Sequence, residues 1–177
     1  MKHKSSRAVL LAALLFGVCL AYGQDASGPR PKRARTPEDY KPRTLKEVSA
    51  EGPGAESRGN KEETMLVEGD ILPSRVRVKY AGSSRRLPPI KREVLRQWAR
   101  LYAGSPEGYT KPYETEVLFT EDGAEHWLAV KREALPRFER ELKRGGEVDL
   151  YLIRLGAAKA SGKWEPVLLI ESFQKPD

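Results

Sequence analysis

Apolar residues form an unbroken run over residues 8–21, become scarce until residue 64, and then recur with strand and helix periods. The run follows a basic start and is shorter than the roughly 20 residues that a membrane-spanning helix needs. It predicts a secretion signal over residues 1–23, cleaved after Gly23. We therefore expect a secreted or periplasmic protein with no stable membrane span after cleavage.

Two alternatives apply to this first segment. Cys19 lies where a lipoprotein carries its acylated cysteine, but Val18 before it is not the small residue that a bacterial lipobox requires. An uncleaved anchor is the other alternative. Because Cys19 is the only cysteine and leaves with the signal, the mature chain has no disulfide and no cysteine for catalysis or metal binding.

Residues 24–63 contain few large apolar side chains and are rich in Pro, Gly and charged residues. Such a composition buries too little surface to offset the entropy of ordering, so it predicts a disordered basic linker. A solvated linker is one interpretation of its basic stretch. The other is an electrostatic tether to a polyanion, with candidate contacts at Arg30, Lys32, Arg33 and Arg35.

Residues 64–177 show the patterns of a single folded domain. Residues 64–67 and 75–80 read as strands, and the second alternates strictly between apolar and polar positions. Residues 89–102 read as an amphipathic helix. Its expected apolar stripe is Ile90, Val94, Trp98, Leu101 and Tyr102, and its expected polar face is Lys91, Arg92, Glu93, Arg96 and Arg100.

The clearest local signal is Asp122-Gly123 between two strand-like runs, residues 114–120 and 125–131. Asp-Gly favours a two-residue hairpin turn, because both positions accept positive φ. That turn places Phe119 opposite His126 and Leu118 opposite Trp127. The expected core face carries Val117, Phe119, Leu128 and Val130 with His126, and the other, mostly polar, face carries Glu116, Leu118, Trp127, Ala129 and Lys131.

A short helix with Leu135, Phe138 and Leu142 on one side follows, and residues 148–155 and 164–173 are two further strands. Five strands with a helix between the third and fourth resemble the OB-fold, a five-stranded Greek-key barrel, as found in exported bacterial proteins. The resemblance lies in element order, and the helix at 89–102 departs from it. We expect an α+β fold: either this antiparallel barrel or an open antiparallel sheet with two helices on one side.

No cofactor or metal site is expected, since the mature chain has one histidine, His126, and no ligand spacing. The paired carboxylates Glu68 with Asp70 and Glu121 with Asp122 fit turn chemistry better than acid–base catalysis. Residues 1–23 hold three of 32 basic residues and none of 25 acidic ones, so the mature chain has 29 basic against 25 acidic residues. That balance makes nucleic acid an unlikely partner.

Trp127 has two interpretations: it is core, covered by the helix at 89–102, or it is a ligand platform. The candidate ligand contacts are Trp127, Leu118, Lys131, Lys159 and Lys163. The expected function is an exported, non-catalytic binding or scaffolding module whose ligand is an envelope protein or glycan. The alternatives are a polyanion binder that uses the basic N-terminal segment and a carboxylate-based hydrolase.

Overall fold

The computed structural model describes residues 35–50, 64–69, 71–160 and 163–176, and these residues belong to one compact unit. The expected signal at residues 1–23, Cys19, and the candidate contacts Arg30, Lys32 and Arg33 lie outside the described residues. None of the helices in the described part is long and apolar enough to cross a membrane.

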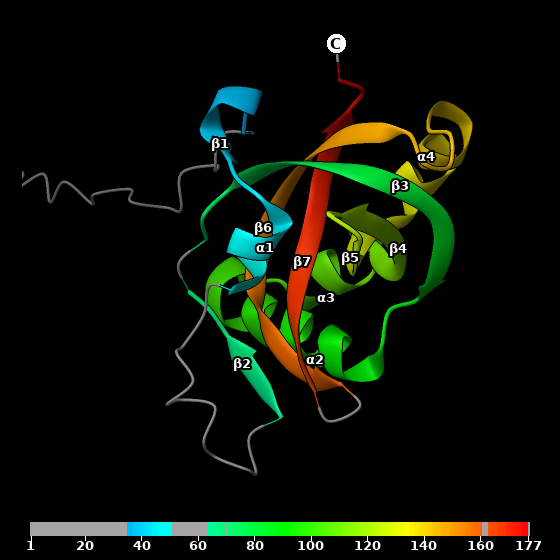
Figure 1. Ribbon diagram of the computed structural model, residues 1–177. Helices are drawn as coiled ribbons and strands as arrows, with labels where there is room; N and C mark the ends of the chain where they lie inside the picture. Colours follow the sequence, from blue (N-terminus) through cyan, green and yellow to red (C-terminus); the bar gives the residue numbers. More distant parts are fainter. Residues whose placement is uncertain (1–34, 51–63, 70, 161–162, 177) are drawn as a thin grey trace, which may run out of the picture. The chain divides into compact units, whose positions relative to one another are not determined.

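The core of the fold is a closed barrel of five strands (Figure 1). They are β3 (Ser74–Arg86), β4 (Tyr113–Glu121), β5 (Ala124–Lys131), β6 (Glu147–Ala160) and β7 (Lys163–Gln174). Their order is β3-β4-β5-β7-β6, and β6 returns to β3. The expected small α+β barrel with OB-like element order is confirmed, with one refinement: β5 and β7 pair in parallel, whereas the other barrel pairs are antiparallel.

Closure depends on the bend in β3, which is 13 residues long. Its first half pairs with β6 and its second half with β4, and the register shifts between Tyr80 and Ser84. Gly82 lies within this bulge at φ 77°, a conformation that costs glycine little. The bulge lets one strand turn from one neighbour to the next and so close the sheet.

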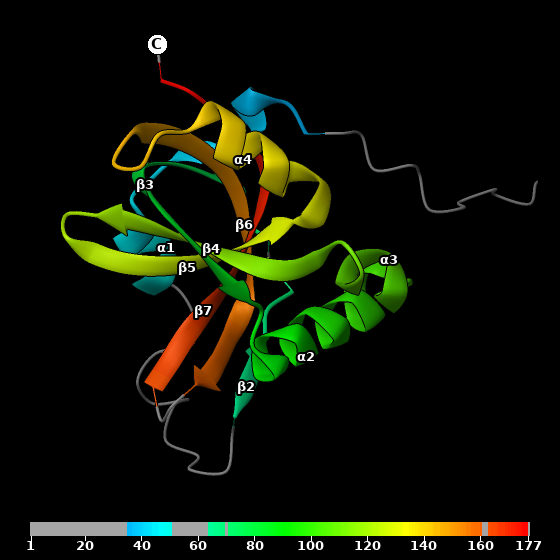
Figure 2. The same cartoon turned by 90° about the vertical axis from the view of Figure 1, so that its right-hand side faces the viewer.

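Two short strands extend the sheet beyond the barrel. β1 (Lys41–Pro42) pairs in parallel with β3, and β2 (Met65–Val67) pairs with the far end of β6 (Figure 2). Gly156 of β6 has φ 146°, and a Cβ there would lie 2.0 Å from the carbonyl oxygen of Leu66. Glycine at this position therefore allows β2 to approach.

The predicted hairpin is confirmed. Asp122 and Gly123 have φ of 50° and 81°, and Phe119 pairs with His126 and Leu118 with Trp127 as expected. The expected core face does point into the barrel. The other face is not mostly polar: Leu118 and Ala129 are both buried, and Ala129 lies in a cluster with α2 (Pro89–Trp98), which packs against the outside of the barrel.

Two hydrophobic clusters result, one on each side of the barrel wall. The interior cluster includes Val76, Val78, Val117, Phe119, Leu128, Val130, Leu150, Leu152, Leu168 and Ile170. The outer cluster, beneath α2, includes Leu87, Val94, Leu95, Trp98, Ala99, Ala129, Leu155, Val167 and Leu169. α2 lies outside the barrel at one end, whereas α4 (Leu135–Glu141) lies at the other and contributes Phe138 to the interior (Figure 2).

The predicted stripe of the helix at 89–102 needs correction at its C-terminal end. After Trp98 the chain continues as a π-helical turn, Ala99–Ala103, which ends at Gly104 and leads to α3 (Pro106–Thr110). Leu101 and Tyr102 belong to this turn, which departs from the α-helical period of 3.6 residues. They are 62% and 45% exposed and do not belong to the buried stripe.

The prediction of a disordered segment over residues 24–63 is wrong for residues 35–50, while 24–34 and 51–63 lie outside the described residues. This stretch forms a 3₁₀ turn (Pro37–Asp39), β1 and α1 (Leu45–Ala50). Leu45 and Val48 are fully buried in the interior cluster. Two apolar side chains one turn apart are enough to dock a short helix when its ends are also held.

Both ends of α1 are held by the barrel. The backbone N–H groups of Leu45 and Lys46 donate to the Glu121 carboxylate at 2.8 and 3.0 Å. At the other end the guanidinium of Arg154 donates to the carbonyl oxygens of Val48 and Ser49, both at 3.0 Å. A carboxylate at the N-terminus and a cation at the C-terminus satisfy the free backbone groups of the helix.

We predict that Leu45→Ala lowers the free energy of unfolding by about 2–5 kcal/mol, since it opens a cavity in the interior cluster. Lys46→Ala is the control, because Lys46 is the exposed neighbour of Leu45; it should change stability by no more than about 0.5 kcal/mol. Urea denaturation measures both. Equal stability of the two variants would show that α1 is not part of the core.

Candidate functional site

The barrel wall has an opening between β5 and β7. The two parallel strands pair at Ala129 with Leu169 and at Val130 with Ile170, and toward their N-terminal ends they diverge. Pro166 lies in the diverging part of β7 and has no N–H to donate, which suits an edge position in a sheet. The space between the strands is a pocket of about 190 Å³.

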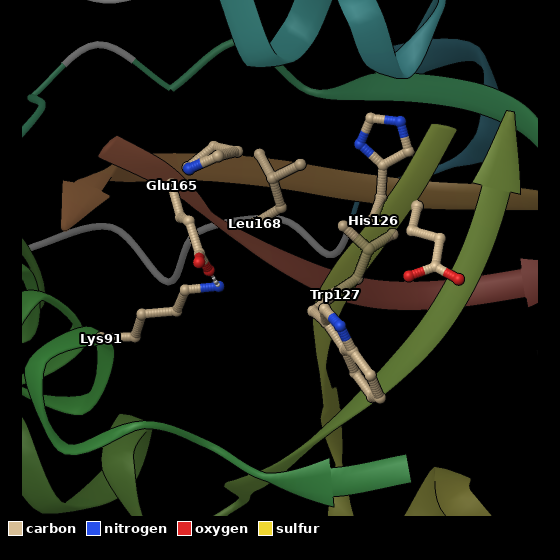
Figure 3. Close-up of a pocket in the computed structure, with 8 residues that line it drawn as sticks. Lys91, His126, Trp127, Glu165 and Leu168 are labelled. Carbon is tan, nitrogen blue, oxygen red and sulfur yellow. Dashed lines mark ion pairs between the residues drawn. The ribbon is translucent and has the colours of Figure 1, made fainter. Parts of the chain in front are cut away.

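Side chains of three elements line this pocket (Figure 3). The lining residues are Lys91 of α2, Glu125, His126, Trp127 and Leu128 of β5, and Glu165, Pro166 and Leu168 of β7. His126 and Trp127 point to opposite sides of β5, as consecutive strand residues do. The pocket therefore has an inner wall on the barrel side and an outer wall on the side of α2.

The outer wall is an ion-pair cluster around Lys91. Its Nζ lies 2.8 Å from Glu116 Oε1 and 2.8 Å from Glu165 Oε2. The side chains of Lys91 and Glu116 are 2% and 1% exposed, whereas Glu165 is 36% exposed. The prediction that Lys91 belongs to the polar face of its helix is wrong: it points into the protein because carboxylates of β4 and β7 neutralise it there.

Arg85 connects this cluster to Trp127. Its guanidinium lies 2.7 Å from Glu116 and 3.7 Å from Glu165, and its Cζ lies 4.2 Å from the centre of the Trp127 ring. Trp127 is half-buried. One face of the indole is thus covered by a cation, in a geometry typical of cation–π contacts.

The inner wall is apolar apart from His126. Leu128 and Leu168 belong to the interior cluster, and His126 is half-buried beside them. Burial lowers the pKa of His126, and the nearby Glu121 carboxylate opposes this only in part. The imidazole is therefore neutral at pH 7 and has one nitrogen available to accept a hydrogen bond.

The structure brings only part of the predicted contact set together. Trp127 lines the pocket, and Leu118, its partner across the hairpin, is 8% exposed. Lys131 ends β5 and pairs with Tyr113, and Lys159 and Lys163 lie in the β6–β7 hairpin. These three lysines are not among the residues that line the pocket.

The other candidate groups have structural partners. Arg35, proposed as a polyanion contact, forms an ion pair of 2.7 Å with Glu171. Glu68 pairs with Arg154 at 2.8 Å, and Glu121 caps α1. Across the described ranges, no group of three or more His, Cys, Asp or Glu residues is placed to hold a metal ion.

The ion pairs of Lys91 give a stability prediction. Lys91→Met should lower the free energy of unfolding by about 3 kcal/mol, because it leaves the buried carboxylate of Glu116 with Arg85 as its partner. The double variant with Glu116→Leu also removes this buried carboxylate, which has lost one of its two cations, and should recover at least half of the loss. Urea denaturation measures both, and an undiminished stability of Lys91→Met would contradict this account.

Trp127→Ala should lower the free energy of unfolding by about 1–2 kcal/mol, since it loses the Arg85 contact and part of its buried area. Trp98→Ala is the matched control: Trp98 is 2% exposed, and its loss should cost about 3–5 kcal/mol. The same denaturation experiment compares the two. If the two substitutions lower the free energy of unfolding equally, Trp127 is a core residue and not part of the pocket wall.

Comparison with known proteins identifies no relative: no family model, curated protein or solved structure matches this chain. The geometry and charge of the β5–β7 opening therefore carry the functional assignment.

Proposed function

We propose that this protein is a non-catalytic binding module that holds an extended segment of another protein in the opening between β5 and β7. The observation that carries the proposal is the divergence of these strands beside a pocket. A strand that diverges from its neighbour presents backbone donors and acceptors along its edge. Extended segments of partner proteins bind such edges through main-chain hydrogen bonds, and adjacent pockets select their side chains.

The size of the pocket favours a protein segment over a free small molecule. Its volume of about 190 Å³ is below the roughly 300–1,000 Å³ typical of small-molecule sites. A space of this size accommodates one anchoring side chain. The pocket would then determine which side chain is recognised. The edges of the strands would supply most of the contacts with the bound segment.

The charged groups at the site support binding rather than catalysis. Lys91 and Glu165 are engaged with each other, and burial keeps Lys91 away from solvent. A polyanion is a poorer ligand, because Arg35 already has an internal partner. With the secretion signal expected at residues 1–23, the partner would be a protein of the cell envelope.

The test is selection of a phage-displayed library of random linear peptides on the immobilised full chain, followed by hydrogen exchange on the chain with an enriched peptide bound. We expect slower exchange of backbone amides in residues 124–128 and 163–168, since an added strand satisfies those edges. Amides of α4, on another part of the barrel, should be unchanged and serve as the internal control.

Two results would overturn the proposal. One is a library that yields no binding peptide. The other is a bound peptide that leaves the exchange of β5 and β7 unchanged and protects a different surface.

A further inference from the structure

We infer that the partner segment anchors itself in the β5–β7 opening with a lysine or arginine side chain. The inference rests on the proposed function and names the chemistry of its ligand. Three features of the pocket support it: its net charge, the exposure of its charged side chains, and its aromatic and polar lining residues.

Negative charge predominates around the pocket. The lining residues and the partners bonded to them carry three carboxylates, Glu116, Glu125 and Glu165, and two cations, Lys91 and Arg85. The local charge is therefore −1. In a partly enclosed site this excess favours a cationic group and opposes an anionic one.

Of the two cations, Lys91 is buried, whereas Arg85 is as exposed as Glu165, 36% each, and is already paired with Glu116 at 2.7 Å. Lys91 is 2% exposed and lies between two carboxylates, so an anion that approached it would meet Glu165 first. Glu125, in contrast, is exposed at the rim, and no cation pairs with it in the part of the chain that the structure describes. Glu165 contacts Lys91 and Arg85 through Oε2, so its Oε1 can accept from a further donor.

Aromatic and neutral polar groups complete a cation site. The guanidinium of Arg85 covers one face of the Trp127 ring, so a ligand cation would meet the remaining part of the indole. Neutral His126 can accept a hydrogen bond from an ammonium or guanidinium group. Pro166 is half-buried and offers apolar surface to the long aliphatic part of a lysine or arginine side chain, beside Leu128 and Leu168, which are each 1% exposed.

The experiment uses an enriched peptide whose binding protects β5 and β7 from exchange, and measures its affinity by fluorescence anisotropy. Each lysine or arginine of the peptide is replaced by glutamine in turn. We expect one such replacement to weaken binding at least tenfold. On the protein, Glu125→Lys should weaken binding of the parent peptide to a similar extent, and low ionic strength should enlarge the effect.

The matched control is Glu139→Lys, the same charge change at an exposed position on α4, which should leave the affinity unchanged.

A charge swap between protein and peptide separates a direct contact from a change in the overall charge of the protein. A peptide with glutamate at the sensitive position should bind Glu125→Lys better than the original protein. Both lysine variants should have the same circular dichroism spectrum and melting temperature as the original protein, which shows that they fold.

The outcomes distinguish this inference from the proposed function. A peptide that protects β5 and β7 but contains no required basic residue overturns the inference and leaves the binding function standing. Equal effects of Glu125→Lys and Glu139→Lys also overturn it. Failure of any peptide to protect the two strands overturns the proposed function, and the inference falls with it.

Discussion

A lysine ammonium inside a protein must meet carboxylates, and the pairing of Lys91 with Glu116 and Glu165 determines how α2 lies on the barrel. Glu116 belongs to β4 and Glu165 to β7, so one side chain of α2 joins the two strands that flank β5. Ala129 of β5 pairs with Glu116 and lies in the outer cluster with α2. The ion pairs of Lys91 therefore join the outer cluster to the rim of the opening.

The elements that follow local rules could be predicted from the sequence. Asp122-Gly123 determined the hairpin register, because a two-residue turn leaves only one pairing that keeps Val117, Phe119, Leu128 and Val130 on the same face. The order of strands and helices also indicated a small barrel. The parallel contact of β5 with β7 depends on residues 40 positions apart, and closure of the barrel through β3 and β6 on residues 68 to 78 positions apart. No local pattern encodes either pairing.

Three sequence signals could have improved the prediction. Thr44 and Glu47 have capping-box spacing, and their reciprocal hydrogen bonds of 2.8 and 3.1 Å begin α1 within a stretch whose composition indicated a linker. Lys91 has the spacing of the buried residues Val94, Leu95 and Trp98, so periodicity would have placed it inside. Pro166 in the last strand marked an edge and hence the neighbourhood of the pocket.

The narrow contact between β5 and β7 has an evolutionary consequence. Stability resides in the interior cluster and in the layer beneath α2, whereas the rim residue Glu125 belongs to neither. Mutations at the rim therefore escape most of the selection that preserves the core. Under the proposed binding function, a lineage with this architecture can exchange one partner for another through mutations at a few surface positions, while its folding remains under the same constraint.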